Sequence, residues 1–127
     1  MELENIGKIY TKSEADTLYD AVNSSSKINT SELQNIVTMA KDHIMFQIIE
    51  GELIILDKDR NIIFTDGNSS TVPKSTVFHV FSTSMLNKLL ADNNNQETFI
   101  EKRKNVLTVT NGDATLEQGL PCPPNCS

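Results

Sequence analysis

Both cysteines of this 127-residue chain lie within its last six positions, in the stretch Pro-Cys-Pro-Pro-Asn-Cys-Ser. Two thiolates at the spacing of Cys122 and Cys126 suit Cu(I) or a transient disulfide. A disulfide needs α-carbons about 5.5–6 Å apart, whereas a polyproline-II segment would hold them about 12 Å apart. The segment must therefore fold back, and we expect Pro123, Pro124 and Asn125 to form that turn, because proline and asparagine favour turn positions.

Three prolines remove backbone donors within four positions here, so we expect an exposed tail. A body followed by a glycine and a short Cys/Pro end resembles, in layout, the precursors of ribosomally made, enzymatically modified peptides. The resemblance implies that the body is a leader or carrier and that another enzyme modifies Cys122 and Cys126. Thiol redox or soft-metal binding is a second alternative, although the spacing is not C-x-x-C and no third ligand lies nearby.

The two histidines of the chain favour structural roles. His43 follows a predicted helix, where a cation is favoured by the helix dipole, and we expect it to cap that helix. His79 alternates with apolar residues in TVFHVF, which predicts a strand histidine at the sheet surface or the edge of the core. Neither histidine adjoins a cysteine, so we expect no zinc site.

The spacing of Asp57, Asp59 and Asn61 resembles the start of a calcium loop. An EF-hand loop needs glycine at its sixth position and glutamate at its twelfth, but these positions hold Ile62 and Asn68. A hairpin turn is the better interpretation. Nucleophile elbows, zinc-protease motifs and phosphate-binding glycine loops are absent from the sequence. We therefore expect a protein that is not an enzyme and that uses no cofactor or metal.

The formal net charge is −6, and the densest positive run is only residues 102–104. Nucleic-acid binding draws much of its affinity from phosphate neutralisation, so we expect no nucleic-acid partner. No apolar run approaches the roughly 20 residues of a membrane span, and the first residues lack the pattern of a secretory signal. These features favour a cytoplasmic protein that does not bind membranes.

Helical and strand patterns alternate along the rest of the chain. Thr11 and Glu14 have the spacing of a capping box, as do Ser31 and Gln34, and apolar residues follow each pair at helical spacing. The predicted helices span about residues 12–23, 30–42 and 85–91. β-Branched and apolar runs bounded by turn residues predict strands at about 45–49, 52–56, 61–65, 76–81, 98–101 and 106–110.

These elements predict an α+β fold, in which two N-terminal helices and one short later helix pack on an antiparallel sheet. We expect one domain over residues 1–112 and a flexible tail over 113–127. The predicted function is a small non-catalytic protein-interaction module, with a protein partner or a modifying enzyme as its binding partner. Exposed sheet edges could also support a homodimer.

Overall fold

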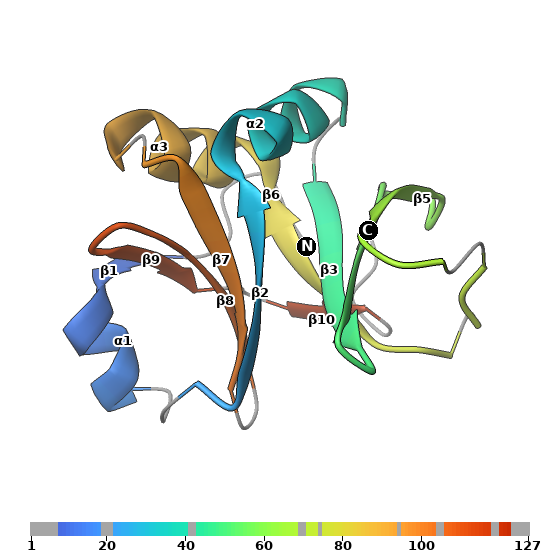
Figure 1. The fold of residues 1–127 in the computed structure, drawn as a ribbon, viewed down its shortest axis with the longest axis horizontal. Helices are drawn as coiled ribbons and strands as arrows, with labels where there is room; N and C mark the ends of the chain where they lie inside the picture. The colour runs from blue at the N-terminus through green and yellow to red at the C-terminus, as the bar shows by residue number, and fades with distance from the viewer. Residues whose placement is uncertain are drawn as a thin grey trace.

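The computed structural model describes residues 8–18, 22–40, 43–68, 71–73, 75–93, 95–103, 106–117 and 120–122. In these residues the protein has an α+β fold of three helices and two five-stranded antiparallel sheets. The two sheets stand side by side, and α2 and α3 lie across their upper ends (Figure 1). The fold class is therefore the predicted one, but the strands divide between two sheets.

The first sheet has the strand order β1-β9-β8-β7-β2. Its strands are β1 (Lys8–Thr11), β2 (Ser24–Asn29), β7 (Glu97–Lys102), β8 (Leu107–Asn111) and β9 (Ala114–Glu117). The second sheet has the order β10-β6-β3-β4-β5. Its strands are β3 (His43–Ile49), β4 (Glu52–Leu56), β5 (Ile62–Thr65), β6 (Phe78–Ser82) and β10 (Leu120–Cys122).

The helices are α1 (Lys12–Leu18), α2 (Thr30–Met39) and α3 (Thr83–Asn93). The predicted capping box of α1 is confirmed: the Thr11 amide donates to Glu14 Oε1 at 2.9 Å, and the Glu14 amide donates to Thr11 Oγ1 at 3.2 Å. For α2 the predicted cap is wrong. Asn29 is the N-cap, and its side chain accepts from the amides of Ser31 and Glu32.

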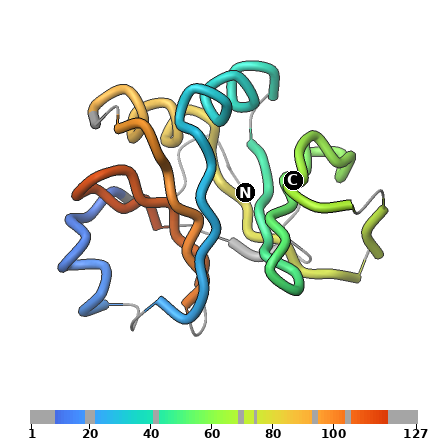
Figure 2. The backbone as a smooth tube through the Cα atoms, viewed as in Figure 1, coloured from blue at the N-terminus to red at the C-terminus, as the bar shows by residue number. Residues whose placement is uncertain are grey.

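The chain contains two halves with the same order of elements. The first half runs β2-α2-β3-β4-β5, and the second runs β6-α3-β7-β8-β9. Each half begins with a strand that pairs with the other half: β2 pairs with β7, and β6 pairs with β3. The backbone tube makes the first exchange visible, because the blue β2 runs along the orange β7 (Figure 2). The two halves therefore share both sheets.

The main hydrophobic core lies between the two sheets and beneath α2 and α3. Ile100, Val109 and Leu116 align across the first sheet and face this core. Phe46 and Phe81 face it from the second sheet, with ring centroids 5.1 Å apart. Because side chains alternate along a strand, the opposite face of the second sheet carries a smaller buried cluster: Met45, Ile54, Leu56, Phe78 and Val80.

Three predictions about element boundaries need correction. The polar stretch SSSKIN lies between the first two predicted helices, where no strand is predicted, but it is strand β2, because all six of its residues pair with β7. Helix α1 ends at Leu18, before the predicted end near residue 23. His43 begins strand β3 and is buried, so it does not occupy the predicted position at the end of a helix.

The predicted domain end at residue 112 is too early. Gly112 and Asp113 form the turn between β8 and β9, and β9 pairs with β8 on one side and β1 on the other. Thr115 and Leu116 of β9 are buried. Further along, β10 pairs with β6 at the edge of the second sheet, where a proline can be accommodated. Residues 118, 119 and 123–127 lie outside the described residues.

Candidate functional site

A groove of about 540 Å³ opens where the β3–β4 hairpin meets the loop formed by residues 71–73 and 75–77. We call this loop the Pro73 loop and the depression the β3–β4 groove. Its apolar wall includes Ile49, Ile54, Val72 and Val77. Val77 is 41% exposed and Ile54 is buried, so the groove passes from the surface towards the smaller apolar cluster.

The hairpin side of the groove has a tight, well-defined turn. Glu50 and Gly51 both have positive φ angles, of 51° and 82°, and they separate the paired residues Ile49 and Glu52. A two-residue turn with two positive φ angles matches the right-handed twist of the flanking strands. The turn therefore fixes the end of β3 and with it the position of Ile49.

Two polar side chains fasten the Pro73 loop to the second sheet. The Gln47 side chain donates to the Val77 carbonyl at 2.9 Å and accepts from the Ile48 amide at 3.0 Å. The Arg60 guanidinium donates to the carbonyls of Pro73 and Thr76 at 3.3 and 3.0 Å. These contacts hold the loop in a fixed place against the sheet, so the groove is preformed.

Arg60 also contacts the sheet beneath the loop. Its guanidinium carbon lies 5.4 Å from the centroid of the Phe78 ring, at cation–π distance. Arg60 has a φ of 67°, in the left-handed region, within the turn that follows β4. In that turn Asp57 Oδ1 accepts from the amides of Asp59 and Asn61, each at 2.9 Å. The acidic spacing read in the sequence therefore forms a hairpin turn.

Lys102 brings a cation to the groove from the first sheet. Its ammonium group donates to the Ile48 carbonyl at 3.5 Å. Lys102 is partly buried, and it is absent from the ion pairs found among the described residues. Gln47 and Glu50 add further polar groups to the lining. The groove thus combines an apolar wall with one cation, Lys102, and one carboxylate, Glu50.

His79 lies close to this cation. It pairs with Phe46 of β3 and Pro121 of β10. Burial, and secondarily the charge of Lys102, lowers the pKa of His79 to about 4. The imidazole is therefore neutral at neutral pH, and it is a weak base.

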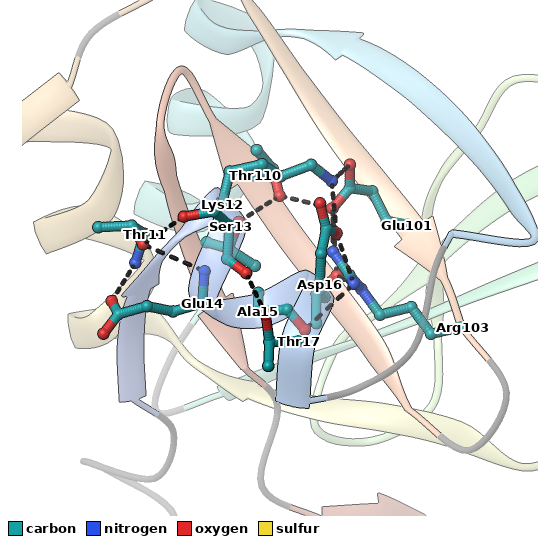
Figure 3. A network of polar contacts seen from close by, with 12 residues as sticks. Thr11, Lys12, Ser13, Glu14, Ala15, Asp16, Thr17, Glu101, Arg103 and Thr110 are labelled. Atoms are coloured by element: carbon teal, nitrogen blue, oxygen red, sulfur yellow. Dashed lines mark hydrogen bonds and ion pairs between the residues drawn. The ribbon is translucent and has the colours of Figure 1, made fainter.

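A partly buried polar network lies elsewhere, on the face of the first sheet that α1 covers (Figure 3). Glu101 Oε2 accepts from the Lys12 ammonium at 2.6 Å. Its Oε1 accepts from Thr110 at 2.6 Å and from Arg103 and Thr108 at 3.3 Å. Arg103 also donates to Asp16 of α1 at 2.9 Å. The two cations and two carboxylates balance in charge. Because Lys12 and Asp16 belong to α1 and Glu101 belongs to β7, this network fastens α1 to the sheet.

The residues that the sequence singled out are only partly described. Cys122 ends the edge strand β10, opposite Phe78. Cys126, Pro123, Pro124 and Asn125 lie outside the described residues. Their proposed chemistry stays a prediction. The groove had no signal in the sequence, because its lining comes from five separate stretches of chain whose meeting depends on the fold.

The described residues hold no group of three or more His, Cys, Asp and Glu side chains placed to bind a metal ion. None of the helices in these residues is long and apolar enough to cross a membrane. Comparison with protein-family models, curated proteins and solved structures finds no match to this chain in any of the three.

Proposed function

We propose that this protein is a non-catalytic interaction module, which binds an extended segment of a protein partner in the β3–β4 groove. The observation that supports this proposal is the groove itself, open to solvent, apolar on its wall and braced by Gln47 and Arg60. A preformed site avoids the entropic cost of ordering a loop on binding. Apolar side chains of the partner would pack on Ile49, Val72 and Val77.

The lining favours a peptide segment over a reactive substrate. Interfaces combine an apolar centre with polar groups around it, and the groove has this composition. The titratable groups of the network around Glu101 are engaged in holding α1. His79 is held neutral by burial. These observations support a binding role.

A charge placed in the apolar wall tests the proposal. Val77→Asp is expected to weaken binding of apolar peptides about tenfold or more, because the new carboxylate must be desolvated in the interface. Met39→Asp is the matched control. Met39 is 72% exposed on α2 and does not line the groove.

The measurement is fluorescence polarisation with labelled nine-residue peptides that carry Leu, Ile, Phe, Val or Met at two alternate positions. Equal loss of binding in both variants, or binding by neither the wild type nor the control, would contradict a docking site in this groove. The folded state of each variant is checked by its urea unfolding midpoint.

We further propose that the module acts in the cytosol, where both thiols would stay reduced unless a specific oxidant acts on them. The alternative role of the tail as a modified end makes a separate claim. It requires an added mass, or a shortened C-terminus, on protein isolated from its own source. A loss of two hydrogens that a reductant restores would instead support the redox alternative.

A further inference from the structure

We propose that the segment bound in the β3–β4 groove carries a carboxylate side chain next to its apolar residues, and that this carboxylate pairs with Lys102. The inference rests on the proposed function and specifies the chemistry of the partner. It distinguishes apolar peptides that carry a neighbouring carboxylate from apolar peptides that lack one.

Among the residues that the structure describes, the hydrogen bonding of Lys102 is incomplete. An ammonium group has three N–H donors, and the interaction described for Lys102 is one long contact with the Ile48 carbonyl, at 3.5 Å. The cation is partly buried, and the described residues give it no ion pair. A carboxylate from a partner would supply the charge-assisted hydrogen bonds that this ammonium lacks.

The position of Lys102 beside the apolar wall lets its positive charge attract a bound carboxylate. The side chain reaches from the end of β7 to the end of β3, so it stands between the two sheets, beside the apolar wall. The positive charge of Lys102 also acts on His79, because it contributes to the lowered pKa of that imidazole. A bound apolar segment would exclude water from the wall, and the attraction between Lys102 and a carboxylate would then strengthen, because exclusion of water lowers the local dielectric.

Glu50, the carboxylate in the groove lining, does not make the groove prefer a peptide with a basic side chain. It lies on the exposed turn of the hairpin and forms no ion pair among the described residues. Ion pairs with an exposed carboxylate such as Glu50 contribute little to affinity. The overall charge of −6 acts over longer distances, but salt screens it beyond a Debye length of about 8–10 Å. The nearby cation therefore determines the preference.

The test uses matched pairs of acetylated and amidated nine-residue peptides. Both members of a pair carry the same two apolar side chains, and they differ only by Asp or Asn at one adjacent position. The full-length wild-type chain is expected to bind the Asp peptide about five- to tenfold more tightly than the Asn peptide, with a preference that shrinks as salt is raised. This comparison needs no variant.

Substitution then assigns the preference to one side chain. In Lys102→Met the Asp and Asn peptides should bind with about equal affinity, because the cation that favours Asp is gone. Binding of the Asn peptide should be retained, because methionine keeps an apolar side chain at this position. Lys88→Met is the matched control. Lys88 is exposed on α3 and outside the groove, and its loss removes the same charge, so the preference should be unchanged.

The outcomes separate the two claims. If Asp and Asn peptides bind the wild type equally, or if Lys102→Met keeps the preference, the carboxylate inference is contradicted and the groove remains a binding site. If no peptide of either series binds at about millimolar concentration, the proposed function is contradicted as well, and the inference is lost with it.

Discussion

At the scale of single residues, Glu101 is the side chain on which the attachment of α1 depends. Four donors from both sides of the helix–sheet contact converge on its two oxygens. The Arg103 side chain beside it is fully buried. Neutralising Glu101 would remove the buried carboxylate that faces Arg103 and leave that guanidinium paired with Asp16, whose side chain is 46% exposed. Losing one charged partner of a buried ion pair is costly, because the remaining desolvated ion regains no hydration.

We therefore expect Glu101→Gln to lower the free energy of unfolding by about 3 kcal/mol. Glu97→Gln is the control, since Glu97 pairs with Lys27 where both side chains are more than half exposed, and such a pair contributes about 0–1 kcal/mol. Urea unfolding curves give both values. Equal effects of the two substitutions would mean that the network under α1 is as solvated as the surface pair.

At the scale of elements, two hairpin turns depend on glycine for different reasons. A Cβ at Gly51 would meet nothing within 4 Å, so its positive φ of 82° is the only obstacle to another residue. A Cβ at Gly112, where φ is 64°, would lie 2.4 Å from Asn95 Nδ2. That amide donates to Asn111 Oδ1 at 3.1 Å, so it cannot move without breaking a hydrogen bond.

Gly51→Ala should therefore cost about 1 kcal/mol of stability, from backbone strain alone. Gly112→Ala should cost about 1 kcal/mol more, because it adds the lost hydrogen bond of Asn95 to the same strain. Urea unfolding of the two variants side by side measures the difference. A larger loss for Gly51→Ala than for Gly112→Ala would refute the assignment of these roles.

Elements with a strong local pattern were predictable, and elements made by pairing were not. The capping box of Thr11 and Glu14 acts within one turn of chain, so four residues suffice to indicate it. Strand β2 has the sequence SSSKIN, without apolar alternation, and it is a strand because β7 lies beside it. The predicted domain end at residue 112 falls inside the two-residue hairpin turn that Gly112 and Asp113 form between the paired residues Asn111 and Ala114.

The residues of the candidate site were likewise predictable only where a local sequence feature marks them. Cys122 and Cys126 could be singled out from the sequence, because the presence of a thiol is evident from the residue type alone. The groove residues are ordinary apolar residues, and only the fold brings Ile49, Val77 and Lys102 together. No local spacing rule connects positions so far apart in the sequence, so the site could not be predicted from the chain alone.

At the scale of the whole molecule, the exchange of strands between the two halves determines how the protein folds. β2 contributes to the sheet of the second half, and β6 contributes to the sheet of the first half. β1, which precedes the first half in the sequence, pairs with β9 of the second half. Neither half can complete its own sheet, so we expect them to unfold as one cooperative unit.

Separate peptides of residues 1–74 and 75–127 should each lack a cooperative unfolding transition. Mixed in equal amounts, they should recover one, because each supplies the strand that the other lacks. Circular dichroism with urea titration follows both steps. A cooperative transition in either peptide alone would contradict the mutual dependence of the halves.

The central claim, that the β3–β4 groove is the binding surface, is tested most directly by amide chemical-shift mapping. The ¹⁵N-labelled protein is titrated with the tightest-binding apolar and acidic peptide. The largest shifts are expected at residues 47–50, in the Pro73 loop and at Lys102. Shifts that leave these residues unchanged and gather on α1 or along β2 would contradict the claim.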